Sequence, residues 1–302
     1  MAPKTFQFKR KPLRLGIIKR QNFSIPESII YYIAKNPSTP KVYQKLIQSC
    51  KYFGQKNPIL LLHCLKYSDY SNSWFTCSKI GKKSCKEING KMCDDLYEQK
   101  IDYEIIKSQK IWITNRFEVM TPYHQEPFNI PKNIKPSEFL FHALSTKFSM
   151  EKFIQIGLSV KSCDLWDISV IKENQSTASL IEIIQCFPLL EKFVCFGNRT
   201  NSTTVKELLK LPQFLKLKSF QLGNITEEFD IETFYHTFLK KNKTMDVVLC
   251  FDYGISESYK QKVLKIINEI LESNSNDFWS PYFGGPWNNE LHEKLHALNY
   301  RD

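Results

Sequence analysis

Hydrophobic positions between Leu189 and Leu249 repeat about every 27 to 28 residues. Each repeat has apolar residues at helical spacing, followed by a short apolar segment that predicts a strand. The predicted strand cores are Leu190–Phe196, Leu217–Leu222 and Met245–Phe251. A period of roughly 20 to 50 residues is typical of stacked repeats, which bury a core between neighbouring units and present a long surface to a partner. The pattern therefore favours a protein that binds over one that catalyses.

The alternating pattern extends upstream of these repeats. Residues Ser149–Ile156 predict a helix and Val160–Trp166 a strand, which together form one more helix–strand unit. Further strands are predicted at Lys110–Thr114, extended through Phe117–Met120, and at Glu138–Leu144. By contrast, residues 68 to 100 are rich in Ser, Lys, Gly and Cys and show no clear period, so they predict a loop-rich connector.

Helix start signals support the helices of the repeats. Ser179–Glu182 and Thr204–Glu207 have the spacing of a capping box, and Asp230 can cap the next helix. After Ser256, a last helix is expected to cover the open end of the repeats. The aromatic tail Phe278–Trp287 is interpreted as a cap on that end, and a binding hot spot is the alternative.

The N-terminal region predicts two short amphipathic helices over residues 24 to 56. Ser24–Glu27 has capping-box spacing, Pro37 and Pro40 interrupt the helical pattern, and a second helix is expected to start near Lys41. Gly54 and Asn57-Pro58 mark its end.

This helical pair resembles an F-box. The resemblance rests on Ile25–Ile33, which begins with an Ile-Pro-Glu stretch, and on Leu46–Phe53, in which a Cys is closely followed by an aromatic residue. It implies a docking site for the Skp-type adaptor of a cullin–RING ubiquitin ligase, and through that adaptor for a cullin. An exposed apolar helix face would be required for docking. The residues implied are Ile25, Pro26, Ile29, Ile30, Ile33, Leu46, Ile47, Cys50 and Phe53. The alternative is that these residues form only the core of an ordinary helical pair.

The repeat region resembles a divergent leucine-rich repeat in which Phe often replaces Leu and the asparagine ladder is absent. The combination of an F-box-like module and this repeat region resembles the large, divergent F-box families of nematode type. In those families the repeats bind the substrate protein. The expected fold class is α/β (α+β), with a small N-terminal helical F-box-like module followed by a helix–strand solenoid. The expected segments are a basic flexible arm (1–22), the F-box-like module (23–66), the connector (67–109), the repeats (110–275) and an aromatic C-terminal cap with a helix (276–302).

Charge and composition narrow the choice of partners. The chain of 302 residues carries a net charge of +11, and seven basic residues lie in the first twenty positions. We interpret this arm as solvated, and the alternative function is a scaffold that binds protein, or nucleic acid through the arm, without a ligase role. No apolar run reaches the length of a membrane span and no secretory signal core follows the basic N-terminus, so we expect a cytoplasmic or nuclear protein.

Metal binding and catalysis have little support. Nine cysteines occur without a Cys-x-x-Cys pair, and Cys77, Cys85 and Cys93 match no common zinc spacing, so reduced thiols are expected. His292-Glu293-x-x-His296 is the remote alternative, a zinc metalloprotease motif. Only six residues follow its second histidine, too few for the usual third ligand, and a lysine lies inside the motif. We therefore expect no catalytic residue, metal or cofactor, and the ubiquitin chemistry would belong to partner proteins.

Overall fold

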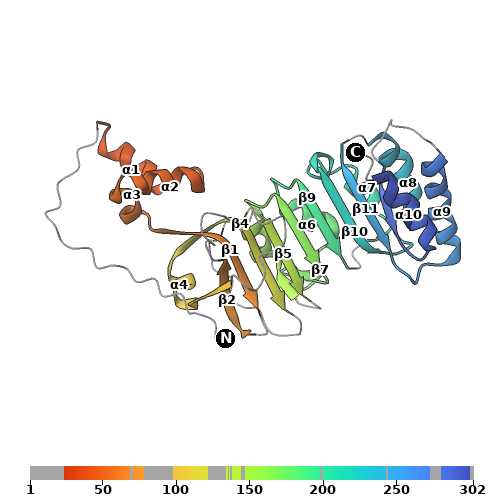
Figure 1. Ribbon diagram of the computed structural model, residues 1–302, viewed down its shortest axis with the longest axis horizontal. Helices are drawn as coiled ribbons and strands as arrows, with labels where there is room; N and C mark the ends of the chain where they lie inside the picture. Colours follow the sequence, from red (N-terminus) through yellow and green to blue (C-terminus); the bar gives the residue numbers. More distant parts are fainter. Residues whose placement is uncertain are drawn as a thin grey trace. The chain divides into compact units, whose positions relative to one another are not determined.

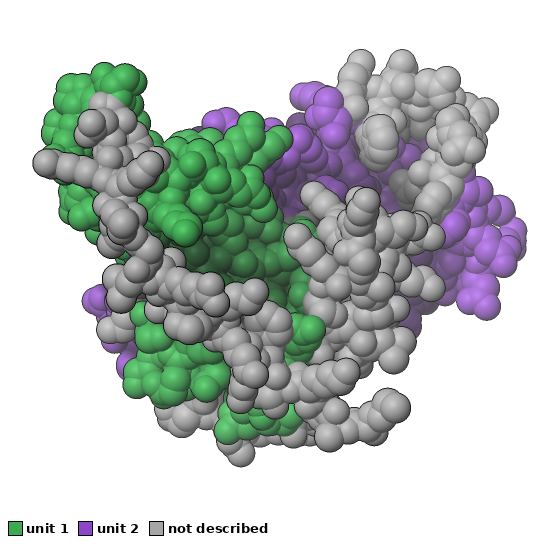
Figure 2. All heavy atoms as spheres, turned by 60° about the vertical axis from the view of Figure 1, so that its left-hand side comes forward, with its two compact units in different colours: residues 1–118, 129–136 green, residues 119–128, 137–302 purple. Residues whose placement is uncertain are grey.

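The fold is α/β, as expected: helices alternate with strands, and the sheet is mostly parallel (Figure 1). The computed structural model describes residues 24–68, 71–77, 98–121, 134, 136, 138–143, 147–197, 200–242, 244–272 and 280–299. The chain divides into two compact units, coloured separately in Figure 2. Unit 1 contains residues 1–118 and 129–136, and unit 2 contains residues 119–128 and 137–302. The predicted arm, the thiols of Cys85 and Cys93, and the start of the aromatic tail lie outside the described residues.

Unit 1 begins with three short helices, α1 (Glu27–Lys35), α2 (Pro40–Ser49) and α3 (Lys51–Lys56). The second predicted helix is therefore divided in two. The division falls at Cys50, whose backbone is extended and whose Sγ accepts the amide N–H of Tyr52 at 3.3 Å. A residue with extended backbone interrupts the helical hydrogen bonds, so the chain can turn there and fold α3 back onto α1 and α2.

The helix starts differ from the prediction in detail. The capping box predicted for Ser24–Glu27 is wrong, because Pro26 is the N-cap residue of α1 and no side chain caps this helix. Helix α2 starts one residue earlier than expected, at Pro40. The hydroxyl of Thr39 accepts the N–H of Val42 at 3.1 Å, and a proline at the first helical position has the backbone angle that a helix needs.

The rest of unit 1 consists of strands and one helix, in which β1 pairs antiparallel with β2, and β2 with β3. Its elements are β1 (Ile59–Ser68), β2 (Ser73–Cys77), β3 (Glu98–Ile101), α4 (Tyr103–Ser108) and β4 (Lys110–Thr121), with the strands in the order β4-β1-β2-β3. The expectation that residues 67–109 form only a loop-rich connector is therefore wrong where these residues are described. The helical module also ends with α3, since residues 59–68 form a strand. Pairing explains the difference, because β1 buries Leu62, Leu65 and Tyr67 within the sheet.

Tyr43 joins the helices of unit 1 to the first strand. Its side chain is buried, its hydroxyl donates to the carbonyl of Asn57 at 2.8 Å, and the same oxygen accepts the N–H of Ile59 at 2.9 Å. The amide of Asn57 also donates to the carbonyl of Lys35 at 3.2 Å. These bonds satisfy the backbone groups where the chain leaves α3, and they hold the ends of α1 and α3 together.

Unit 2 repeats a strand–helix pattern in which neighbouring strands are parallel and follow one another along the chain (Figure 1). The strand order in this unit is β12-β11-β10-β9-β7-β5, while β6 and β8 pair separately. Its elements are β5 (Glu138–Ala143), β6 (Lys147–Ser149), α5 (Met150–Gly157), β7 (Ser162–Trp166), β8 (Ser169–Ile171), α6 (Leu180–Gln185), β9 (Lys192–Phe196), α7 (Thr204–Leu208), η3 (Phe214–Lys216), β10 (Ser219–Ile225), α8 (Ile231–Thr237), η4 (Leu239–Lys241), β11 (Asp246–Phe251), α9 (Glu257–Glu272), β12 (Tyr282–Gly284) and α10 (Asn289–Asn299).

The predicted strands and helices upstream of the repeats are confirmed. The two segments predicted around residues 110 to 120 form the single strand β4, and the segments predicted at 138, 149 and 160 correspond to β5, α5 and β7. Within the repeats, Lys192 of β9 pairs with Ser219 of β10, which pairs with Asp246 of β11. These partners are 27 residues apart in each step, which agrees with the period of the hydrophobic pattern.

Alternate side chains of each strand form the core of unit 2. Register partners such as Cys163, Phe193 and Phe220 have no exposed surface. The helical layer packs on this face: Phe214 of η3 meets Phe220 edge-on at 5.1 Å between ring centroids, and Phe153 of α5 meets Phe139 of β5 at 5.7 Å. Burying a large aromatic side chain contributes about 1.5–3 kcal/mol, so this row of Phe residues is a major source of stability.

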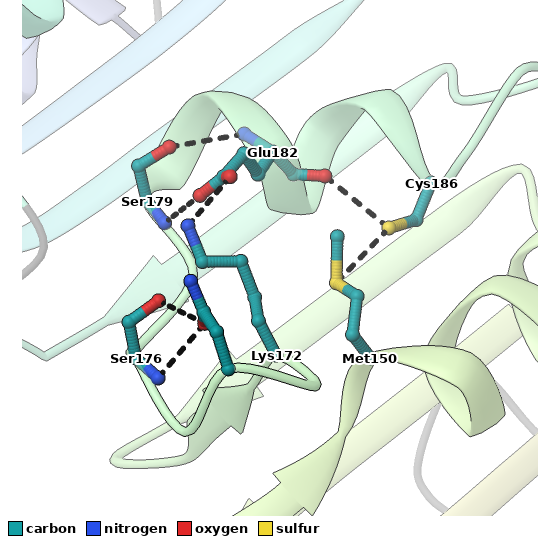
Figure 3. A network of polar contacts seen from close by, with 7 residues as sticks. Met150, Lys172, Ser176, Ser179, Glu182 and Cys186 are labelled. Atoms are coloured by element: carbon teal, nitrogen blue, oxygen red, sulfur yellow. Dashed lines mark hydrogen bonds and ion pairs between the residues drawn. The ribbon is translucent and has the colours of Figure 1, made fainter.

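Hydrogen bonds at the start of α6 confirm the predicted capping box (Figure 3). The amide of Glu182 donates to Ser179 Oγ at 3.2 Å, and the Glu182 carboxylate accepts the Ser179 N–H at 2.7 Å. Lys172 Nζ also donates to this carboxylate at 2.8 Å, which together with the Ser179 N–H lowers the pKa of Glu182. Asp230 caps α8 as predicted, with Oδ1 accepting the Thr233 N–H at 3.0 Å.

The capping box predicted for Thr204–Glu207 is wrong. Helix α7 begins at Thr204, its N-cap Thr203 makes no side-chain cap, and the Thr204 hydroxyl instead donates to Asn201 Oδ1 at 3.0 Å. A side-chain hydrogen bond to a preceding asparagine competes with capping, and here it determines where the helix starts.

Helices α9 and α10 complete the C-terminal end of unit 2. Helix α9 buries Val263, Ile267 and neighbouring apolar residues, as expected for the last helix of the repeats. After it, Trp287 packs 5.8 Å from Phe251 and donates its indole N–H to the carbonyl of Phe283 at 3.2 Å. None of the helices in the described ranges is long and apolar enough to cross a bilayer.

Candidate protein-binding surfaces

The nine residues implied as adaptor contacts divide into a core set and a surface set. Ile30, Cys50 and Phe53 are buried, together with Ala34, in the small core of the three helices. A second group packs partly buried against this core, namely Ile33, Leu46 and Ile47. These six residues therefore hold the helices together, and the first three have too little exposed surface to touch a partner.

The other three residues, Ile25, Pro26 and Ile29, lie on the surface. Ile25 is 43 % exposed and Ile29 is 47 % exposed, although both are large aliphatic side chains. Tyr32, which the sequence reading did not include, is 68 % exposed. Ile29 and Tyr32 are three positions apart, so they lie on one side of α1, and Ile25 lies just before the helix, next to its N-cap residue Pro26. We call Ile25, Ile29 and Tyr32 the α1 stripe.

The α1 stripe lies on the side of the helix away from its core. Ile30 and Ala34, one and five positions after Ile29, are the buried residues of α1. At about 100° per residue, Ala34 points nearly opposite to Tyr32. The core of the three helices therefore uses one face of α1 and leaves a second apolar face in solvent. An exposed apolar face of this kind is typical of a protein interaction site.

The second surface is the face of the unit 2 sheet opposite the buried Phe row. On β7, β9, β10 and β11 every other side chain is only half-buried or exposed, including Val194, Gln221 and Val248. Along the chain, each new strand of unit 2 is added on the same side of the strand before it. Right-handed crossovers then place the connecting helices on one face of the sheet. We call the other face the open sheet face.

An aromatic row crosses the open sheet face. Trp166 of β7 is the register partner of Phe196 of β9, which is the register partner of Gly223 of β10. The Trp166 and Phe196 rings are stacked, with centroids 4.0 Å apart and planes 7° apart. Gly223 makes room for the Phe196 ring, because a Cβ atom at this position would lie 2.1 Å from Phe196 Cδ1. The sequence alone did not identify this row, because the three residues become neighbours only through the strand register.

Trp166 is held in one orientation. Its indole N–H donates to Asp164 Oδ1 at 2.6 Å, and Asp164 lies two residues earlier on the same face of β7. The indole nevertheless remains 38 % exposed. A fixed and exposed aromatic side chain can bind a partner at a low cost in side-chain entropy.

The edge of the unit 2 sheet where β7, β9 and β10 begin is held by a ladder of alternating charge. Glu191, just before β9, accepts from Lys218 Nζ at 2.6 Å and from Lys161 Nζ at 3.0 Å. These lysines lie just before β10 and β7. Hydrogen bonds from Lys218 and then Lys161 lower the pKa of Glu191 to about 2. The ladder links the starts of three neighbouring strands.

The histidines of the His-Glu-x-x-His segment lie on α10, and the described geometry does not present them to a metal. His292 Nδ1 is 3.3 Å from the Tyr282 hydroxyl, and its Nε2 is 3.3 Å from the Gly285 carbonyl. Both ring nitrogens of His292 therefore have protein partners. In the described part of the chain, no three His, Cys, Asp or Glu side chains converge in a group that could hold a metal ion.

Cys163 and Cys186 are two buried thiols of unit 2. Burial raises the pKa of Cys163 well above its ordinary value and that of Cys186 to about 11, so both are protonated and poorly nucleophilic near neutral pH.

A scan against protein-family models, a search of curated proteins and a search of solved structures each found no match to this chain.

Proposed function

We propose that this protein is the substrate-recognition subunit of a cytoplasmic or nuclear cullin–RING ubiquitin ligase. In this proposal, the α1 stripe docks a Skp-type adaptor, the adaptor connects the chain to a cullin, and the open sheet face binds the substrate protein. The chain itself performs no chemistry, since the partner proteins carry the ubiquitin.

The α1 stripe is the observation that carries this proposal. The three helices of unit 1 bury a small core around Ile30, Ala34, Cys50 and Phe53, yet Ile25, Ile29 and Tyr32 remain in solvent. Removing such side chains from water is favourable by roughly 25 cal/mol per Å² of apolar surface, and a partner with an apolar groove would provide the burial. The resemblance of residues 25–53 to an F-box is the reason for proposing a Skp-type adaptor as the partner.

The open sheet face supports the second half of the proposal. It spans four parallel strands that are covered by helices on their other side, and it offers a rigid surface whose side chains differ from strand to strand. Repeat proteins bind their partners on surfaces of this kind.

Co-purification of the full chain with a Skp-type adaptor tests the proposal. The wild type should elute with the adaptor in gel filtration, and Ile29→Asp should abolish co-elution, because a charge would enter an apolar interface at a cost of about 2 kcal/mol or more. Leu158→Asp is the matched control, since Leu158 is also an exposed apolar residue, at 62 %, and lies in unit 2. It should co-elute like the wild type.

Two results would contradict the proposal: a wild type that does not bind the adaptor, or an Ile29→Asp variant that binds it equally well. In either case, a strong salt-dependent affinity of the full chain for RNA or DNA would favour the alternative of a nucleic-acid-binding scaffold.

A further inference from the structure

The aromatic row of Trp166, Phe196 and Gly223 has an asymmetric shape. The two large rings come from β7 and β9, and the register partner of Phe196 on β10 is Gly223. The register between β10 and β11 shifts beyond Leu222, and on the next two strands Cys250 and its register partner Gly284 are also small. The Phe196 ring lies over Gly223. Gly223 is buried under this ring, so a side chain of a bound partner can pack on the exposed part of the Trp166–Phe196 pair.

The loops after β7, β10 and β11 are acidic, while the loop after β9 contains Arg199, which lies outside the described residues. Asp167 directly follows Trp166, Glu227 and Glu228 follow β10, and Asp252 follows β11. Asp167, Glu227 and Glu228 are exposed and Asp252 is half-buried. The described residues of these three loops, 167–168, 224–229 and 252–256, contain no lysine or arginine.

This local charge is opposite to that of the whole chain, which has a net charge of +11. A negative rim beside an apolar row attracts a positively charged partner and repels nucleic acids and acidic peptides. The planar guanidinium group of arginine fits both features, because it stacks on aromatic rings and pairs with carboxylates.

We infer that the row of Trp166, Phe196 and Gly223 binds an extended, basic segment of the partner protein, with an apolar side chain on the row and arginine or lysine side chains toward Asp167 and Asp252. This inference rests on the proposed function for its identification of the partner as a ligase substrate. The binding chemistry itself depends only on the open sheet face.

Two labelled peptides of equal length test the inference on the full chain. One alternates arginine with phenylalanine, and the other has glutamate in place of each arginine. The arginine peptide should raise fluorescence anisotropy on binding and shift the indole N–H signal of Trp166 in a ¹⁵N correlation spectrum, where Trp166→Phe assigns the signal. The glutamate peptide should do neither. Equal binding of both peptides, or no binding of either, would overturn the inference.

Two variants of the row separate its apolar and charged parts. Gly223→Leu places a side chain where the Phe196 ring lies and should weaken binding of the arginine peptide by at least roughly tenfold. The double variant Asp167→Asn with Asp252→Asn should also weaken it roughly tenfold. It keeps the fold, because asparagine tolerates the positive φ of Asp167 and can accept the Gly254 N–H as Asp252 does at 2.7 Å. This second variant tests the inference even if Gly223→Leu does not fold.

Leu215→Ser is the control, since Leu215 is 55 % exposed and lies in η3 of the helical layer. It should bind the arginine peptide like the wild type. If both row variants bind as tightly as Leu215→Ser, the row is not the site.

Adaptor binding is measured separately, so peptide binding without adaptor binding would contradict only the proposed function. Adaptor binding without peptide binding would contradict only this inference.

Discussion

Asp167 and Asn224 follow equivalent positions of the aromatic row, and both have a left-handed backbone, with φ of 50° and 54°. Aspartate and asparagine tolerate this conformation better than other side chains that carry a Cβ. Asp167 directly follows the end of β7, and Asn224 lies within β10 where its register with β11 shifts. Backbone geometry therefore restricts the residue type at both positions.

Replacing Asn224 separates backbone geometry from side-chain chemistry. Asn224→Val should lower the free energy of unfolding by about 1–2 kcal/mol, because a β-branched residue is strained at positive φ. Asn224→Gly should leave stability unchanged or raise it slightly, since glycine adopts this conformation freely. Urea denaturation followed by circular dichroism measures both. A valine variant as stable as the glycine variant would show that the backbone at this position has another conformation.

Glu191 makes the stability of unit 2 depend on pH. Its pKa in the folded protein is about 2, below the value in the unfolded chain. The ion pairs with Lys218 and Lys161 therefore contribute fully above the unfolded-state pKa, and their contribution is lost as the pH falls toward 2.

The pKa of Glu191 can be measured through the carbon NMR signal of its carboxyl group. Lys218→Met should raise this pKa toward the ordinary range for glutamate, because Lys218 supplies the shorter of the two ion pairs. Lys216→Met removes a lysine two positions away and should leave the titration unchanged. An unchanged pKa in the Lys218 variant would mean that the ladder does not form in solution.

At the scale of whole elements, the sequence pattern predicted most of unit 2 and less of unit 1. The helices and strands of unit 2 were predictable because every other residue of each successive strand faces the core. The hydrophobic pattern of the sequence therefore has the same period as the structure. Strand β1 was not recognised, because its apolar run Pro58–Leu65 shows no alternation and its antiparallel partner β2 comes from a segment with no clear period.

The candidate surfaces were predictable only in part. A helical pattern identifies apolar residues without distinguishing a core face from an exposed one, so Ile30 and Ile29 looked equivalent although only Ile29 is exposed. The aromatic row joins positions 30 and 27 residues apart, and it depends on the exact strand register. Gly223, a glycine within a strand pattern, was the one available signal of a close contact.

The contact between α5 and the end of α6 gives a test at the same scale. A Cβ atom on Gly157 would lie 2.2 Å from the carbonyl oxygen of Cys186. Gly157→Ala should therefore destabilise the protein by about 1–3 kcal/mol, since backbone would have to move. Gly54→Ala is the matched control: it lies in α3, its Cβ would meet only Ile47 at 3.6 Å or more, and alanine favours a helix. Thermal unfolding of both variants measures the difference, and equal melting temperatures would contradict the close packing.

At the scale of the whole molecule, the two proposed binding surfaces belong to different compact units. The α1 stripe is supported by a core within unit 1, and the aromatic row by strands within unit 2. A change on one surface should therefore leave the other intact. Ile29→Asp should keep the affinity of the wild type for the arginine peptide, measured by fluorescence anisotropy, and Gly223→Leu should keep adaptor binding. Loss of both activities in either single variant would contradict independent surfaces.

Hydrogen–deuterium exchange of the full chain with and without a Skp-type adaptor tests the central claim most directly. The account predicts that the adaptor slows amide exchange in residues 25–35, which carry the α1 stripe, while α6 and β9 in unit 2 exchange as in the free protein. With Ile29→Asp, adaptor should cause no slowing in residues 25–35. Unchanged exchange in that segment of the wild type, at adaptor concentrations that saturate a known F-box protein, would contradict the account.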